Sequence, residues 1–217
     1  MKKFNLSINK IIILLFLLIK PLYSAEMTDP IKVDWSFKGL TGTFDRASLQ
    51  RGFQVYKEVC SSCHSMQYLS YRNLGESGGP EFTEAEVKAI AASFEVTDGP
   101  DSQGEMFTRP GRPSDMFVSP HPNKEAAAAA NGGAYPPDMS VLVKARKGGA
   151  NYIYSVLVGY EDPPPGVTLD QGVYYNKYMI GNKIKMPNNL EDGLIEYADG
   201  TAVSYTHLRA HETPRHL

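Results

Sequence analysis

Two cysteines and a histidine lie together in the segment Cys60-Ser61-Ser62-Cys63-His64, and these are the only cysteines of the 217-residue chain. Three kinds of site use cysteines at this spacing: a redox dithiol, a structural zinc site and a covalently attached haem. A redox dithiol has no need of the histidine, and a structural zinc site takes four ligands. Haem attachment uses all three residues, because the two thiols form thioethers and the adjacent imidazole can bind the iron. The motif therefore favours a c-type haem.

A second axial ligand is expected if the iron serves electron transfer, and methionine in that position raises the reduction potential. Of the eight methionines, Met179 and Met186 come late in the chain. Pro187 forces extended backbone at Met186, which suits a loop that crosses a haem edge. The residues alone leave Met179 as a rival. His121 is the rival nitrogen ligand, although its Pro-rich loop predicts a solvated side chain.

Residues 1–24 are predicted to be a signal peptide. Three lysines precede an unbroken apolar run of nine residues, 11–19. That length is typical of a signal-peptide core and is too short for a helix that crosses a bilayer. Small residues at Ser24 and Ala25 offer a cleavage point. We therefore expect an exported chain, which agrees with haem attachment outside the cytoplasm.

The other end of the chain, residues 202–217, holds three of the five histidines and has no apolar period. It is similar to a translated sequencing-adapter read-through, so we interpret it as an artefact; a disordered natural tail is the alternative. Residues 25–201 are predicted to form one domain, because they are numerous enough to bury a sizeable core.

Charge patterning makes the predicted domain acidic. The ends just described hold four Lys, two Arg and one Glu, and residues 25–201 keep 16 basic and 23 acidic side chains. Seven acids and one lysine fall within 81–105. Such a segment is usually a solvated acidic face, and it would also steer a basic partner at low salt. A net negative domain excludes nucleic acid as a plausible partner.

Helices separated by long Gly/Pro-rich loops are expected, with little strand pattern. Leu49, Phe53, Tyr56 and Cys60 follow a helical period, so this helix presents the thiols from its C-terminal end. Thr43 or Asp45 is its expected cap, and Thr83 with Glu86 forms a capping pattern for the next helix. The expected helices span 43–59, 83–94, 125–130, 138–147 and 150–160. Such a chain is expected to surround a bound group that takes the place of part of its hydrophobic core, and a haem would be that group.

Three segments carry a resemblance to a known family: "RGFQVYKEVCSSCHSM", "NGGAYPPDMSVLVKARKGGANYIYSVLVGYEDPP" and "KMPNNLEDGLIEYADGT". In this order they resemble cytochrome c1, the haem subunit of the bacterial cytochrome bc1 complex, over nearly all of residues 28–201. The resemblance implies a mostly α, cytochrome c-like domain wrapped around one covalent c-type haem, with long Gly/Pro-rich loops.

The resemblance also implies roles for eight residues. Cys60 and Cys63 match the thioether cysteines, His64 matches the proximal ligand and Met186 matches the axial methionine. The remaining matches are Arg146, which pairs with a haem propionate, and the haem-pocket positions Tyr152, Pro136 and Pro137.

By the same resemblance, the chain would carry electrons from the Rieske iron–sulfur protein through its haem to a soluble cytochrome c. It would do no bond-making chemistry of its own. Its membrane partners would be cytochrome b and the Rieske protein, on the periplasmic face of the bacterial cell membrane. The alternatives are a soluble periplasmic monohaem carrier and a ligand-binding or catalytic haem protein with an open sixth site.

The chain departs from the family in two ways. It cannot form the extra disulfide of some bacterial members, because its two cysteines belong to the haem motif. The family also continues with a helix and a membrane anchor, which would lie beyond Thr201. We therefore expect a truncated sequence in which Leu49, Phe53 and Tyr56 lose their covering helix and stay exposed.

Overall fold

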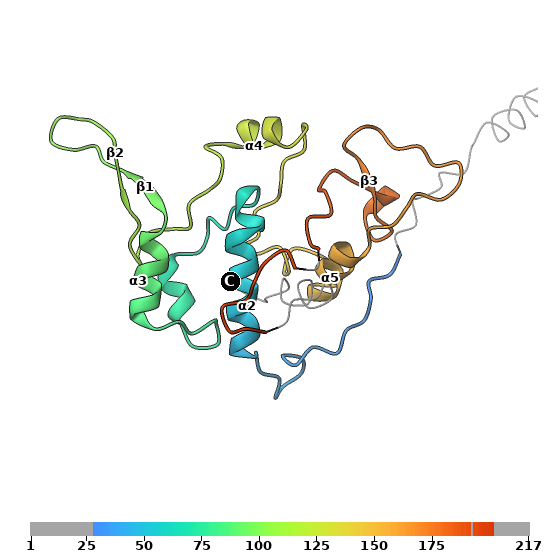
Figure 1. The fold of residues 1–217 in the computed structure, drawn as a ribbon, viewed down its shortest axis with the longest axis horizontal. Helices are drawn as coiled ribbons and strands as arrows, with labels where there is room; N and C mark the ends of the chain where they lie inside the picture. The colour runs from blue at the N-terminus through green and yellow to red at the C-terminus, as the bar shows by residue number, and fades with distance from the viewer. Residues whose placement is uncertain (1–27, 192, 202–217) are drawn as a thin grey trace, which may run out of the picture.

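A computed structural model describes residues 28–191 and 193–201. The predicted signal peptide and the tail from residue 202 lie outside these residues. Figure 1 shows α2 near the middle, with α3 and the hairpin β1–β2 on one side and α5 and β3 on the other. The main elements are α2 (Arg46–Glu58), α3 (Glu84–Ala92), β1 (Glu95–Asp98), β2 (Phe107–Pro110), α4 (Lys124–Ala130), α5 (Ala150–Val158), β3 (Tyr174–Tyr175) and β4 (Lys183–Ile184).

Short helical turns complete the mostly helical architecture, which agrees with the predicted fold class. These 3₁₀ turns are η1 (Cys60–Ser62), η2 (Tyr71–Gly75) and η3 (Ile180–Asn182). Within the part of the chain that the structure describes, no helix is both long and apolar enough to cross a membrane.

Local signals set the ends of the helices as predicted. The carboxylate of Asp45 accepts a hydrogen bond from Ser48 N at 2.7 Å and begins α2. Thr83 and Glu86 form the expected reciprocal capping box at the start of α3. Asn131 follows α4 directly, as expected. These ends agree with the prediction because each cap depends only on residues within one helical turn.

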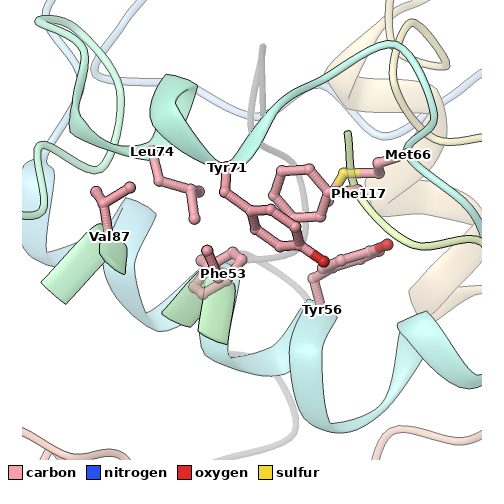
Figure 2. Close-up of a cluster of buried hydrophobic side chains, with 8 residues drawn as sticks. Phe53, Tyr56, Met66, Tyr71, Leu74, Val87 and Phe117 are labelled. Atoms are coloured by element: carbon pink, nitrogen blue, oxygen red, sulfur yellow. The ribbon is translucent and has the colours of Figure 1, made fainter. Parts of the chain in front are cut away.

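An aromatic core packs against one side of α2. Its buried members come from α2, η2, α3, the loop before η2 and the segment between β2 and α4, and Figure 2 shows their side chains converging. The rings of Tyr71 and Phe117 stack with their centroids 4.6 Å apart. The buried members of this core are Phe53, Tyr56, Met66, Tyr71, Leu74, Val87, Ala91 and Phe117.

A second cluster covers another side of α2 with the end of the described chain. Val55 packs with Leu190, Ile195 and Tyr197. We call residues 193–201 the C-terminal strap, because polar contacts also tie it to α2. The side-chain amide of Gln54 donates to the Glu196 carbonyl at 2.8 Å and its oxygen accepts from Ala198 N at 3.2 Å.

The expectation that Leu49, Phe53 and Tyr56 would stay exposed is wrong. Their side chains are only 7%, 3% and 3% exposed, respectively. Phe53 and Tyr56 lie in the aromatic core rather than against a later helix. Segments within the described chain therefore cover the apolar stripe of α2.

An acid-sensitive ion pair fastens the strap. Arg51 Nη1 lies 2.7 Å from Asp199 Oδ2. Hydrogen bonds from Thr201 and Arg51 lower the pKa of Asp199 to about 2 from its ordinary 3.8. A carboxylate with a depressed folded-state pKa stabilises the fold fully above its unfolded pKa, and this contribution is lost as the pH falls through the folded value.

We expect hydrogen-exchange protection of the Ala198 amide to hold above about pH 4 and to fall between about pH 4 and pH 2, the window between the two pKa values. Asp199→Asn should lower that protection at neutral pH, because the amide lacks the charge that attracts Arg51. Protection that is independent of pH in the unmodified chain would show that the ion pair does not hold the strap.

Two parts of the secondary-structure prediction are wrong. Residues 138–147, expected to be helical, form consecutive turns that end in Gly148 and Gly149, both with positive φ. The loops at 97–123 and 172–190 contain strands that pair as the antiparallel hairpins β1–β2 and β3–β4. At the start of the first segment, Asp138, Met139 and Ser140 form hydrogen bonds with residues 65–68, and these replace the first turn of the expected helix.

Candidate haem site

The cysteine motif occupies a tight turn at the C-terminal end of α2. Helix α2 ends at Glu58, and η1 follows after Val59. The Cys60 carbonyl accepts hydrogen bonds from Cys63 N at 3.1 Å and from His64 N at 2.8 Å. These bonds close the turn, so the two thiols and the imidazole are presented from one short segment.

The position of the motif in the fold argues against a redox dithiol and a structural zinc site. The thiols are half-buried and are not joined in a disulfide. They lie at the end of a helix, whereas redox dithiols use the start of one, where the helix dipole favours a thiolate. Among residues 28–191 and 193–201, no group of three or more His, Cys, Asp or Glu side chains is placed to hold a metal ion.

The ring of His64 has one nitrogen committed to the protein. Its Nδ1 lies 2.8 Å from the carbonyl oxygen of Pro137. A carbonyl can only accept a hydrogen bond, so Nδ1 carries a proton, and in the neutral ring Nε2 then keeps its lone pair. Burial lowers the pKa of His64, against smaller opposing effects of Pro137 and Asp138. The side chain is therefore a neutral imidazole with Nε2 as a donor atom, and it fits the iron of a c-type haem.

Asp138 is a site residue that sequence reasoning missed. Its carboxylate accepts hydrogen bonds from Ser65 Oγ at 2.7 Å, Gln67 N at 2.9 Å and Ser140 N at 2.9 Å. Burial raises the pKa of Asp138, but these hydrogen bonds outweigh it and hold the pKa below its ordinary value. The only sequence signal was an acid directly after Pro136 and Pro137.

The two rival methionines differ in which atom the protein holds. Met179 uses its sulfur, which accepts a hydrogen bond from the Tyr152 hydroxyl at 3.4 Å. Half-buried Met186 is held by its backbone instead, because the Tyr160 hydroxyl donates to its carbonyl at 2.9 Å. Lys185 anchors the same loop through Gly132 O at 2.6 Å. A fixed backbone suits a ligand, and no described residue donates a hydrogen bond to the Met186 sulfur. Met186 as the axial residue stays a prediction.

Other candidates are not joined to His64. Arg146 is exposed and donates a long hydrogen bond, 3.4 Å, to the carbonyl of Ala145 next to it. Its pairing with a haem propionate stays a prediction. The expectation that His121 is solvated is wrong for its Nε2, which is buried and has no hydrogen-bond partner among the described residues.

Comparison with known proteins identifies the family. Residues 35–211 match the Cytochrome C1 family. The chain belongs to the cytochrome c1 family. The sequence resemblance is thereby confirmed, and a c-type haem is the cofactor of this family. The roles of Cys60, Cys63 and His64 in holding it stay predictions.

Three curated relatives support this assignment. The chain is 54% identical over 166 residues to "Cytochrome c1-2, heme protein, mitochondrial" of Solanum tuberosum, covering 76% of this chain and 63% of the relative. It is 50% identical over 189 residues to "Cytochrome c1" of Rhodospirillum rubrum, covering 80% and 68%. It is also 50% identical over 186 residues to "Cytochrome b/c1" of Bradyrhizobium diazoefficiens, covering 77% and 27%. The chain thus spans less than two thirds of the potato and Bradyrhizobium cytochrome c1 relatives.

Proposed function

We propose that this chain is the electron-transfer subunit of a membrane-associated cytochrome bc1 complex on the periplasmic side of a bacterial cell membrane. It passes electrons from the Rieske iron–sulfur protein to a soluble cytochrome c, with cytochrome b as its other partner in the membrane. When bound, a c-type haem supplies an iron that alternates between the ferric and ferrous states. The single observation that carries the proposal is the His64 imidazole, with its Nδ1 against the Pro137 carbonyl, beside two thiols in one turn.

Each proposed site residue has a distinct task. Cys60 and Cys63 would hold the cofactor covalently, and His64 and Met186 would supply ligands to its iron. The remaining proposed contacts are Arg146 toward a propionate and Tyr152, Pro136 and Pro137 in the pocket. Membership of the cytochrome c1 family favours the complex subunit over a soluble monohaem carrier.

Haem attachment is tested by denaturing electrophoresis. Expressed with a haem-maturation system in an exporting host, the chain should keep its haem in the gel, because thioether bonds survive denaturation. Cys60→Ala/Cys63→Ala should lose it entirely. Replacing Ser61 and Ser62, which lie in the same turn, with alanine is the matched control and should retain it. Loss of haem from the unmodified chain would contradict the proposed function.

Docking of the soluble acceptor is expected to depend on salt. Three acids of the segment 81–105 are paired: Asp98 with Arg109, Glu81 with Arg46 and Glu84 with Lys88. Four others lie exposed on α3, β1 and the loop after β1: Glu86, Glu95, Asp101 and Glu105. Exposed charges attract a partner over about 30 Å at 0.01 M salt but only about 8 Å at 0.15 M.

Electron transfer to a basic soluble cytochrome should therefore slow as ionic strength rises through this range, as stopped-flow measurements can show. Glu95→Gln/Glu105→Gln should flatten the salt dependence. Asp162→Asn/Asp170→Asn removes two exposed acids from another loop and should leave it steep. A rate that is indifferent to salt in the unmodified chain would rule out electrostatic steering.

A further inference from the structure

We propose that Asp138 is a positioning residue for His64, an inference that rests on the proposed function. Its carboxylate fixes the segment that carries the Pro137 carbonyl, which accepts the Nδ1–H of His64. In this way Asp138 sets the tautomer and the donor strength of the imidazole from outside the coordination shell.

The geometry places Asp138 between two segments that are far apart in sequence. Its Oδ2 accepts from Ser65 Oγ at 2.7 Å and from Gln67 N at 2.9 Å, while Oδ1 accepts from Ser140 N at 2.9 Å. Ser65 follows His64 directly, and Asp138 follows Pro137 directly. The Asp138 carboxylate therefore links the residue that follows Pro137 to the residue that follows His64, on both sides of the His64–Pro137 hydrogen bond.

Two further hydrogen bonds keep the same segments in register. Met139 N donates to Ser65 O at 2.8 Å, and Tyr68 N donates to Ser140 Oγ at 3.1 Å. Ser65 and Ser140 are each only 7% exposed, so water cannot readily replace their bonds to Asp138. A buried polar group that loses its partner carries a desolvation cost. This cost would favour rearrangement of all the hydrogen bonds between the segment that follows His64 and the segment that follows Pro137.

The expected consequence concerns the ligand strength of His64. An acceptor on Nδ1–H raises the basicity of the other ring nitrogen, and such outer contacts tune a bound metal. A stronger donor stabilises ferric over ferrous iron. If the Pro137 carbonyl turns away, His64 becomes a weaker donor and the reduction potential rises.

The test compares Asp138→Ala with Asp115→Ala in the haem-loaded chain. Asp115 is a matched control, because its carboxylate also accepts three hydrogen bonds, two from Arg109 and one from Arg112 N, none of them within the His64 connection. We expect Asp138→Ala to lower the ferric-to-ferrous ratio at a fixed applied potential about tenfold, which is a rise of about 59 mV for one electron. Asp115→Ala should leave the ratio unchanged.

A second readout follows the proton itself. In the reduced protein, solvent exchange of the His64 Nδ1 proton, measured by NMR, should quicken at least about tenfold in Asp138→Ala, because the acceptor is no longer held in place. If Asp138→Ala does not fold, Ser65→Ala removes one donor to the carboxylate and should produce smaller shifts in the same directions.

The outcomes separate the two proposals. A chain that takes up no covalent haem would overturn the proposed function. The positioning role alone would be overturned if haem-loaded Asp138→Ala had the same reduction potential and the same proton exchange as the unmodified protein. If Asp138→Ala does not fold, the same comparison is made with Ser65→Ala. Equal shifts in Asp138→Ala and Asp115→Ala would also overturn it, because they would reflect general loosening of the fold.

Discussion

Met186→Ala is expected to open the haem iron to carbon monoxide and to lower the reduction potential. The reason is that only His64 would remain as an axial ligand, and methionine is the ligand that raises the potential. The visible spectrum of the reduced protein under CO measures the first effect, and a redox titration measures the second. The unmodified protein, with both axial positions filled, should not bind CO.

Met179→Ala is the matched control, since both methionines are half-buried and come late in the chain. It removes the sulfur that accepts from Tyr152, so it should loosen that contact without exposing the iron. If Met179→Ala binds CO and Met186→Ala does not, the assignment of the axial ligand is reversed.

Phe53→Ala is expected to cost about 3–5 kcal/mol of unfolding free energy, the usual penalty for removing a buried phenylalanine. Phe53 is 3% exposed, and its ring makes edge contacts with the rings of Phe82 and Phe117. The ring centroids lie 5.6 Å and 6.3 Å apart, respectively. Natural domains hold only about 5–15 kcal/mol in total. The variant would therefore lose a large part of its stability, and α2 would pack less tightly against the aromatic core.

Urea unfolding of the haem-loaded chain measures this effect through the transition midpoint at unchanged slope. Phe107→Ala serves as the control, because this ring is 45% exposed on β2 and its loss should change the free energy by no more than about 0.5 kcal/mol. Equal losses from the two variants would show that burial in the aromatic core does not determine the stability of α2.

The two effects are connected through α2. The same helix packs Phe53 into the aromatic core, contacts the strap through Val55 and ends at Glu58, two residues before Cys60. A change in its packing would therefore move the thiols and His64 together. This arrangement explains why a long helix precedes a motif whose chemistry needs only five residues.

By itself, the sequence determined the features that depend on neighbours along the chain. The haem motif is a fixed spacing of three side chains, and the caps at Asp45 and Thr83 act within one turn of the helices they begin. The apolar period of α2 likewise identified the stripe of Leu49, Phe53 and Tyr56, although not that this stripe would be buried. Family resemblance favoured Met186 as the axial ligand, a prediction that the residues alone left open against Met179.

Only the tertiary structure decided what covers α2 and what holds His64. The aromatic core and the C-terminal strap reach α2 from distant segments, so the stripe that was expected to stay exposed is buried. The segment 138–147 does not form the predicted helix, and at its start Asp138 and its neighbours form hydrogen bonds with residues 65–68. Pro137 contacts His64, which lies 73 residues earlier in the chain. Periodicity describes only local order, and the free energy of a buried hydrogen bond to a distant partner can exceed the small preference of such a segment for a helix.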